Sequence, residues 1–346
     1  MNHTDILLPR PAALDRARAQ LPGFLLCGVI AVAATFVSEH HGGPQFLYAL
    51  LLGIAFHFLA DSEKCAPGIE IAARQMVRIG VALLGVRIGA GDVGALGLAG
   101  LAVLAGAVAL TIGCGLVLAR LLRLPPMFGL LSGGASGICG ISAALAISST
   151  LPRGRDNERY TLLTAIGVAV LSTAAMVVYP LVAGIAGLTT AEAGLFLGGA
   201  IHDVSQVVGA GYMISPAVGD AATLAKMFRV AMLVPVVIVL AVLFRNRPRH
   251  GGDGRDGPLV PPFLIAFAAL VLVNSLGWIP PAAAEAGSAV SRWCLLISIA
   301  ALGVKTSFGK LAELGWKPVA LLVGEAAFVA GYMLLAVFLA RTASLM

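Results

Sequence analysis

The sequence is poor in charged residues. Of its 346 residues, only 12% are Asp, Glu, Lys or Arg, while 59% are hydrophobic. A typical soluble domain is about one quarter charged and about half apolar. Mean hydropathy is +0.96, which excludes an ordinary water-soluble enzyme. The long apolar runs also lack the strict alternation of a membrane β-barrel strand. The composition therefore predicts an all-α polytopic membrane protein.

Cysteine is scarce, and no CxxC pair occurs. The five cysteines are Cys27, Cys65, Cys114, Cys139 and Cys294. This pattern indicates neither a disulfide framework nor a thiolate metal site, so no metal and no other cofactor is expected. The net charge is +6, but the basic residues lie mostly in short loops beside apolar runs, where they orient a protein in the bilayer. Membrane lipid is therefore an expected partner, and nucleic acid is not.

Nine apolar runs are interpreted as full membrane spans, at 21–37, 45–60, 69–88, 95–122, 160–187, 221–244, 262–278, 289–304 and 318–340. Residues 1–20 form a polar N-terminal segment. The run 21–37 is interpreted as the first membrane helix, because no convincing cleavage site follows it and many more spans do. We expect a single membrane domain over 21–341, with a basic loop at about 245–260.

Two further apolar segments, 130–142 and 195–206, are interrupted by paired glycines and polar side chains. In hydrocarbon, such a break is tolerated only where protein or a water-filled cavity satisfies the freed backbone groups. The two segments match each other, with Gly133-Gly134-Ala135 on Gly198-Gly199-Ala200. The sequence therefore predicts two discontinuous or re-entrant helices that meet near the membrane midplane.

The chain also repeats itself at an offset of 218 positions. This shift places Arg74 on Arg292, the residues 84–87 (LGVR) on 302–305 (LGVK), Leu96-Gly97 on Leu314-Gly315, and Gly106 on Gly324. We interpret this as a duplicated helix pair within two inverted repeats, at about 45–187 and 190–341. The positions of the basic loops favour nine crossings plus two re-entrant segments, with the N-terminus in the cytoplasm. Eleven crossings, two of them discontinuous, are the alternative.

Inverted repeats with paired broken helices are typical of secondary transporters, whose site lies between the repeats. A helix that begins inside the membrane presents free N–H groups and a positive dipole end, which favours a small anion as substrate. Such N-termini are expected after Gly134 and after Gly199. The alternative is that the glycines only allow close helix packing. The predicted substrate-binding residues are Gly133, Gly134, Ser136, Gly137, Gly198, Gly199, His202, Ser205, Gln206, Lys226 and Arg229.

Lys226 and Arg229 lie on one helical face inside a predicted span. They are expected to supply the positive charge that an anion needs. The alternative is that they extend to the lipid headgroups or pair with Asp203 or Asp220. Asp203 and His202 are the candidates for binding a coupling ion, because both lie at the second predicted break.

Other polar residues have simpler expected roles. Glu70 and Arg74 are one helical turn apart and predict an ion pair. His57, Asn274 and Glu325 are single polar residues in apolar runs and are expected to form hydrogen bonds between helices, although Glu325 is also a candidate proton carrier.

Two other classes of function compete with a transporter. One is an anion channel. The other is an intramembrane serine protease, because residues 134–137 (GASG) resemble the Gly-x-Ser-Gly of rhomboid proteases, with Ser136 as nucleophile and His202 as base. That string is short, and a protease has no need of a duplicated Gly-Gly-Ala framework. We therefore expect no catalytic activity.

Three longer strings carry a family resemblance, at 129–149 (GLLSGGASGICGISAALAISS), 198–212 (GGAIHDVSQVVGAGY) and 226–237 (KMFRVAMLVPVV). Through them the chain resembles the YeiH-type family of bacterial inner-membrane proteins, described as sulfate exporters, from about Leu21 to the C-terminus. The resemblance implies membership of the superfamily of cation/proton antiporters and anion transporters. It also implies the bacterial inner membrane as location and sulfate, or a related oxyanion or sulfonate, as substrate. A homodimer is a reasonable expectation for such carriers.

Overall fold

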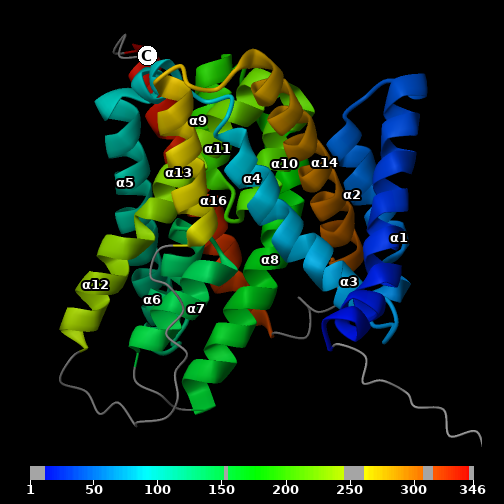
Figure 1. Ribbon diagram of the computed structural model, residues 1–346. Coiled ribbons are helices and arrows are strands. Elements are labelled where there is room, and N and C mark those ends of the chain that lie inside the picture. Colours follow the sequence, from blue (N-terminus) through cyan, green and yellow to red (C-terminus); the bar gives the residue numbers. More distant parts are fainter. Residues whose placement is uncertain (1–11, 152–154, 245–260, 307–314, 343–346) are drawn as a thin grey trace, which may run out of the picture. The chain divides into compact units, whose positions relative to one another are not determined.

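The computed structural model describes residues 12–151, 155–244, 261–306 and 315–342, and every regular element in these ranges is a helix (Figure 1). Within these ranges, six helices are long and apolar enough to cross a membrane: Arg18–His41, Leu96–Leu121, Arg159–Ile185, Pro216–Leu243, Pro281–Lys305 and Trp316–Thr342. The protein is therefore a multi-pass helical membrane protein. The predicted loop at 245–260 and most of the polar segment at 1–20 lie outside the described residues.

The other three predicted spans are shorter or interrupted helices. They are α2 (Gln45–Ala55), the series α3 (Ala66–Ile71), π-helical η2 (Ala72–Met76) and α4 (Val77–Leu84), and α13 (Pro262–Ser275). At about 1.5 Å per residue, α13 extends roughly 21 Å, which is less than the ~30 Å of the hydrocarbon layer. Hydropathy identifies an apolar run, but it does not report where the helix within that run ends.

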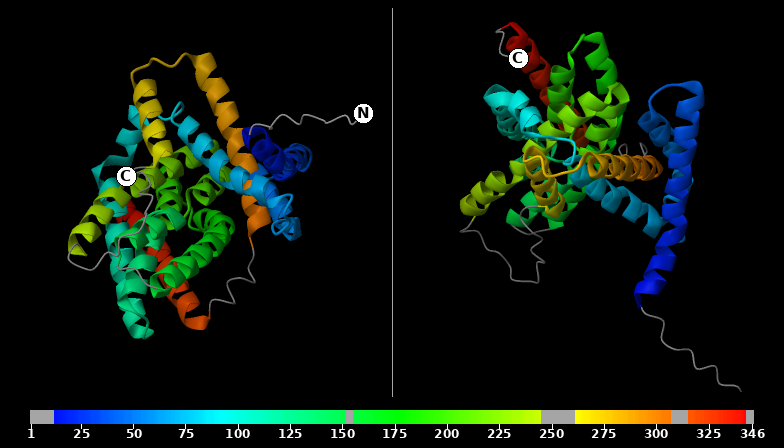
Figure 2. Two further views of the ribbon diagram at one scale, coloured as in Figure 1. Left: turned by 60° about the horizontal axis from the view of Figure 1, so that its bottom comes forward. Right: turned by 45° about the horizontal axis from the view of Figure 1, so that its top comes forward.

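The described chain divides into two compact units. The first consists of Met1–Arg78 and Leu296–Lys305, and it contains α1 (Ala12–His41), α2 and α3. Figure 2 shows α1 and α2 side by side. In this unit, His57 Nδ1 lies 2.8 Å from the Val304 carbonyl oxygen, and Glu70 pairs with both Arg74 and Lys305. The predicted interhelical hydrogen bond of His57 and the predicted pair of Glu70 with Arg74 are both confirmed.

The second unit consists of Ile79–Leu295 and Thr306–Met346. Besides α13 and parts of α4 and α14 (Pro281–Lys305), its helices are α5 (Ala90–Leu121), α6 (Pro126–Gly137), α7 (Ile141–Thr150), α8 (Arg155–Ile185), α9 (Thr190–Ala200), α10 (Val204–Ile214), α11 (Pro216–Ala231), α12 (Leu233–Leu243) and α16 (Trp316–Thr342). Asn274 on α13 donates from Nδ2 to the carbonyl of Ile88 at 3.2 Å, so its partner lies in the loop between α4 and α5 rather than in another helix.

Helices α6 and α7 form a hairpin within the second unit. Gly134 on α6 lies against Ile147 on α7, although the two helices are joined near Gly140, so the chain turns back on itself. In Figure 1 both helices lie in the lower half of the unit. The hairpin packs on α5, where Gly129 lies against Gly115.

Helices α9 and α10 form the second hairpin. On α9, Gly194 lies against Ala221 and Gly198 against Ala225, so α9 runs parallel to α11. Helix α10 turns directly into α11 at Ser215 and packs back along it. The two helices α9 and α10 therefore run in opposite directions, and both lie in the upper half of Figure 1. The two hairpins thus approach each other from opposite ends of the unit.

An ion pair between Glu192, which lies outside the six long helices, and Arg341, near the end of α16, fixes the start of the second hairpin. Glu192 caps α9 together with Thr189, and its Oε1 accepts from Arg341 Nε at 2.8 Å. This hydrogen bond lowers the pKa of Glu192 from 4.5 to about 2. Because the folded-state pKa is depressed, the stabilisation is present above about pH 4.5 and is lost as the pH falls toward 2.

We therefore expect the thermal stability of the purified protein to fall between these pH values by more in the wild type than in Glu192→Gln. The measurement is the melting temperature as a function of pH. The two proteins should converge at the acid end, whereas parallel curves would contradict the role of this pair.

Candidate functional site

The two hairpins meet at their turns. Helix α6 ends at Gly137 and α7 begins at Ile141, while α9 ends at Ala200 and α10 begins at Val204. We call residues 138–140 and 201–203 the crossover. A Cβ placed on Gly140 would lie 3.7 Å from the His202 carbonyl oxygen, so the two turns are adjacent. Gly140 has φ +68°, a left-handed conformation that glycine adopts without steric cost.

The new helices begin a few residues after the paired glycines. Gly134 and Gly199 lie inside α6 and α9, and the next helices begin at Ile141 and Val204. Paired glycines weaken a helix without ending it when neighbouring helices pack against them. Both helix starts lie after the glycines and within the predicted segments 130–142 and 195–206.

Arg229, on α11, joins the two hairpins. Its guanidinium donates from Nε and Nη2 to the Gly137 carbonyl, from Nη2 to Ser136, and from Nη1 to Gly199, with distances of 2.5–2.8 Å. Further contacts reach the carbonyls of Gly198 and Ile201 at 3.2 Å. The last carbonyls of a helix are unpaired and carry its negative dipole end. One cation thus satisfies the C-terminal ends of α6 and α9 together.

Lys226 lies one turn earlier on α11 and repeats this arrangement. Its Nζ donates to the carbonyls of Ile138 at 2.8 Å and of Ile201 at 2.9 Å. Lys226 and Arg229 are both 0% exposed, so they do not extend to lipid headgroups. Their hydrogen bonds go to the backbone rather than to a carboxylate. Neither of the two alternatives considered from the sequence, lipid headgroups or an aspartate partner, describes these contacts. A sequence does not show where a helix ends in space.

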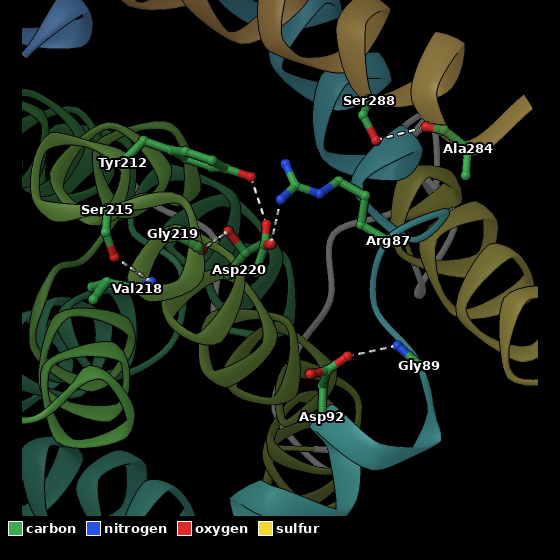
Figure 3. Close-up of polar contacts among 11 residues, drawn as sticks. Arg87, Gly89, Asp92, Tyr212, Ser215, Val218, Gly219, Asp220, Ala284 and Ser288 are labelled. Carbon is green, nitrogen blue, oxygen red and sulfur yellow. Dashed lines mark hydrogen bonds and ion pairs between the residues drawn. The ribbon is translucent and has the colours of Figure 1, made fainter. Parts of the chain in front are cut away.

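Asp220 and Asp203 have other partners. Figure 3 shows that Asp220 accepts from the Tyr212 hydroxyl at 2.6 Å and pairs with Arg87 at 3.1 Å. Asp203 caps α10, where its Oδ1 accepts from the main-chain N–H of Ser205 at 2.9 Å and from the Ser205 hydroxyl at 2.7 Å. The suggested pairing of either aspartate with Lys226 or Arg229 is therefore absent among the described contacts.

The predicted site glycines contact neighbouring helices. Added Cβ atoms would meet the following neighbours: Thr111 and Ile112 for Gly133, Ile147 for Gly134, Val108 for Gly137, Ala222 and Ala225 for Gly198, and Met333 for Gly199. These glycines therefore allow close helix packing. They bring the crossover together whether or not a ligand approaches it.

Both predicted serine hydroxyls already have carboxylate partners. The Ser136 hydroxyl donates to Glu325 Oε2 at 2.8 Å, and the Ser205 hydroxyl donates to Asp203. His202 is 1% exposed and its Nδ1 lies 3.1 Å from the Ser136 carbonyl, which makes this ring nitrogen the donor. The structure thus brings Ser136, His202, Lys226 and Arg229 together, but their polar atoms bond to the protein itself.

Gln206 differs from these residues. It is 1% exposed, and its Nε2 lies 3.5 Å from the Thr173 hydroxyl of α8. Within the described ranges, three buried side-chain oxygens have no hydrogen-bond partner: Gln206 Oε1, Thr164 Oγ1 and Thr111 Oγ1. A buried polar atom without a partner costs about 1–3 kcal/mol, so native proteins rarely leave one unused. Unpaired polar atoms that a ligand could use thus lie on α10, α8 and α5.

Glu325 was expected to be a hydrogen bonder, and the structure makes it a central residue. It is 0% exposed on α16, and its two carboxylate oxygens accept from Ser132 at 2.6 Å and from Ser136 at 2.8 Å. The sequence showed a lone acidic residue in an apolar run, and such a residue inside a membrane span indicates a functional candidate. It did not show the serine partners, which lie nearly 200 positions away.

In the part of the chain that the structure describes, no group of His, Cys, Asp and Glu residues could hold a metal ion. All five cysteines fall within that part and are free thiols.

These features define a multi-pass membrane protein with two opposed helical hairpins joined by buried cations. Over residues 22–322 the chain matches the sequence model of a family described as "Conserved hypothetical protein 698". It is 48% identical to a UPF0324 membrane protein of Chlorobaculum tepidum, over 92% of this chain and 89% of the relative. It is 49% identical to a UPF0324 membrane protein of Rhizobium meliloti, over 90% and 91%.

A third relative is the UPF0324 membrane protein TauZ of Paracoccus pantotrophus, which is 47% identical over 94% of this chain and 96% of its own. The chain therefore belongs to the UPF0324 membrane protein family. The names of these three relatives denote a membrane protein. No solved structure matches the chain.

Proposed function

We propose that the protein is a secondary transporter of a small anion, with sulfate or a related oxyanion or sulfonate as the first candidates. One observation carries the proposal: two opposed hairpins place their helix ends at a common crossover, and two fully buried cations, Lys226 and Arg229, hold them there. Buried intramembrane charge is costly and is characteristic of transport pathways. In secondary transporters, interrupted helices of this kind form the substrate site near the midplane.

Two related glycines support the proposed inverted repeat. The sequence offset of 218 aligns Gly97 with Gly315, and both have left-handed backbones, with φ +61° and +83°. They precede equivalent parts of α5 and α16, which pack on α6 and α9 respectively. In this proposal, the repeats lie at about 45–187 and 190–341 and move relative to each other by alternating access.

The substrate would bind at the N-terminal ends of α7 and α10. Helix α7 begins at Ile141, and its N-cap residue, Gly140, offers no side-chain cap, so the N–H groups of Ile141 and Ser142 can face an anion. Gln206 lies in the first turn of α10, and its amide can turn to present Nε2 instead of the unpaired Oε1. Lys226 and Arg229 would contribute positive charge through space, because their N–H groups already bind the backbone.

The proposal includes the coupling-ion candidates of the sequence, Asp203 and His202, which lie within the crossover. It also includes the bacterial inner membrane, a cytoplasmic N-terminus and a homodimer. The resemblance to YeiH-type sulfate exporters and to the antiporter superfamily supports the substrate class. An anion channel is the second candidate function, and it predicts fluxes far above carrier turnover with no stimulation by counter-substrate.

The test is uptake of radiolabelled sulfate into proteoliposomes, with and without sulfate inside. Saturable uptake that internal sulfate accelerates is the expected result. If well-folded protein moves no sulfate, then sulfate is not the substrate, and a thermal-shift series with sulfite, thiosulfate, sulfonates and carboxylates selects the next anion.

Ser136→Ala separates a transporter from a serine protease. Because the Ser136 hydroxyl donates one hydrogen bond to Glu325, its removal should slow uptake several-fold and destabilise the protein by about 1–3 kcal/mol. A protease with Ser136 as nucleophile would instead lose all of its proteolytic activity in this variant. Uptake rate and melting temperature, measured on the same preparation, decide between the two.

A further inference from the structure

The carboxyl group of Glu325 lies in an unusual setting. It is fully buried, and its hydrogen-bond partners are the hydroxyls of Ser132 and Ser136, both on α6. On the described parts of the helices packed against it, the charged side chains are Asp92, Arg120, Arg159, Glu192, Lys317 and Arg341. None of these forms an ion pair with Glu325. The Cys114 thiol of α5 is the other titratable group that faces it.

A buried carboxylate without a cation is unstable relative to its protonated form. The partners of Glu325 suit both forms, because a hydroxyl can donate to a carboxylate or accept from a carboxyl O–H. Ser132 has a second acceptor in reach, since its Oγ lies 3.4 Å from the Gly129 carbonyl. When Glu325 gains a proton and donates it to Ser132 Oγ, the Ser132 hydroxyl can turn to Gly129. The cluster can thus exchange one proton without leaving a polar atom unpaired.

Asp203 provides a contrast within the same unit. One of its two hydrogen bonds comes from the main-chain N–H of Ser205, and a main-chain N–H can only donate. The two partners of Glu325 are instead both hydroxyls, and a hydroxyl can either donate or accept, so they suit both protonation states.

Ser136 connects this cluster to the crossover. Its hydroxyl binds Glu325, while its main-chain carbonyl accepts from Arg229 and faces His202 Nδ1. A change in the hydrogen bonding of Glu325 therefore acts on the last turn of α6, where the two hairpins are joined.

We propose that Glu325, with Ser132 and Ser136, is a proton-binding site and that it binds the proton that drives transport. The second half of this statement rests on the proposed transport function, whereas the first half can be tested without any substrate.

The first experiment is infrared difference spectroscopy of the purified protein between acidic and alkaline pH. The wild type should show a band of a buried, protonated carboxyl group that Glu325→Gln lacks and that Asp203→Asn retains. Ser132→Ala should shift the frequency of this band, because it removes a hydrogen bond to the carboxyl group. An unchanged band in Glu325→Gln would overturn the proposal. If Glu325→Gln fails to fold, an unshifted band in Ser132→Ala would overturn it instead.

The second experiment measures sulfate uptake with and without a pH gradient. Glu325→Gln should keep exchange of external for internal sulfate, while the stimulation by the gradient falls to none. Arg74→Ala, which removes an exposed side chain outside the crossover, should keep the stimulation. Loss of the stimulation in Asp203→Asn alone would assign the coupling ion to the crossover and overturn the role of Glu325. An absence of sulfate flux in all proteins would contradict the proposed substrate, and the infrared result would then decide the proton site on its own.

Discussion

Arg229→Ala is expected to abolish uptake and to lower the free energy of unfolding by roughly 3 kcal/mol or more. The guanidinium satisfies carbonyls from both α6 and α9, and each carbonyl left unpaired in a buried position costs about 1–3 kcal/mol. Lys226 cannot replace these hydrogen bonds, because its Nζ already donates to the carbonyls of Ile138 and Ile201. The measurement is thermal unfolding of the purified protein together with its uptake rate.

Two variants make this test specific. Arg229→Lys keeps the charge but loses the planar fork that reaches both helix ends, so it should be intermediate in stability. Arg74→Ala removes an arginine whose side chain is 64% exposed and pairs with Glu70. Such pairs contribute about 0–1 kcal/mol. If Arg229→Ala is no less stable than Arg74→Ala, then the crossover does not depend on Arg229.

Much of the helical architecture could be predicted from the sequence. Among the described residues, helices long and apolar enough to cross a membrane occur at six of the nine predicted spans, because long runs of apolar side chains favour membrane helices. The paired glycines also identified both hairpins. The positions of the breaks could not be predicted, because Gly134 and Gly199 remain helical where Ile147 and Met333 pack against them.

The sequence predicted which residues belong to the candidate site, but it did not predict their hydrogen-bond partners. Lys226 and Arg229 were recognisable as functional or structural candidates from their depth in an apolar run. Their hydrogen bonds to helix C-termini could not be predicted, because these bonds depend on where α6 and α9 end in the folded protein. Glu325 could be recognised by the same reasoning, but its link to Ser136 is a contact between residues far apart in the chain, which no local pattern reports.

Gly198→Val is expected to be as damaging as the loss of Arg229, for a steric reason. A Cβ at Gly198 would lie 2.5 Å from the Ala222 carbonyl oxygen and 3.1 Å from the Lys226 main-chain nitrogen. These are backbone atoms of α11 and cannot turn away, so α9 must move off α11. That movement also takes the Gly198 and Gly199 carbonyls away from Arg229. Overpacking of this kind costs about 1–3 kcal/mol or more, and uptake should be lost.

Gly113→Val on α5 is the matched control, because a Cβ there would meet no atom within 4 Å. Both variants place the same β-branched residue inside a helix, so their intrinsic helix propensities cancel in the comparison. Gly134→Ala adds an intermediate case, since the atom it meets is the end of the flexible Ile147 side chain. The expected order of melting temperature and of uptake is Gly113→Val, then Gly134→Ala, then Gly198→Val. Equal uptake in Gly113→Val and Gly198→Val would mean that close contact between α9 and α11 is not needed for transport, and the crossover would then not be the moving part of the cycle.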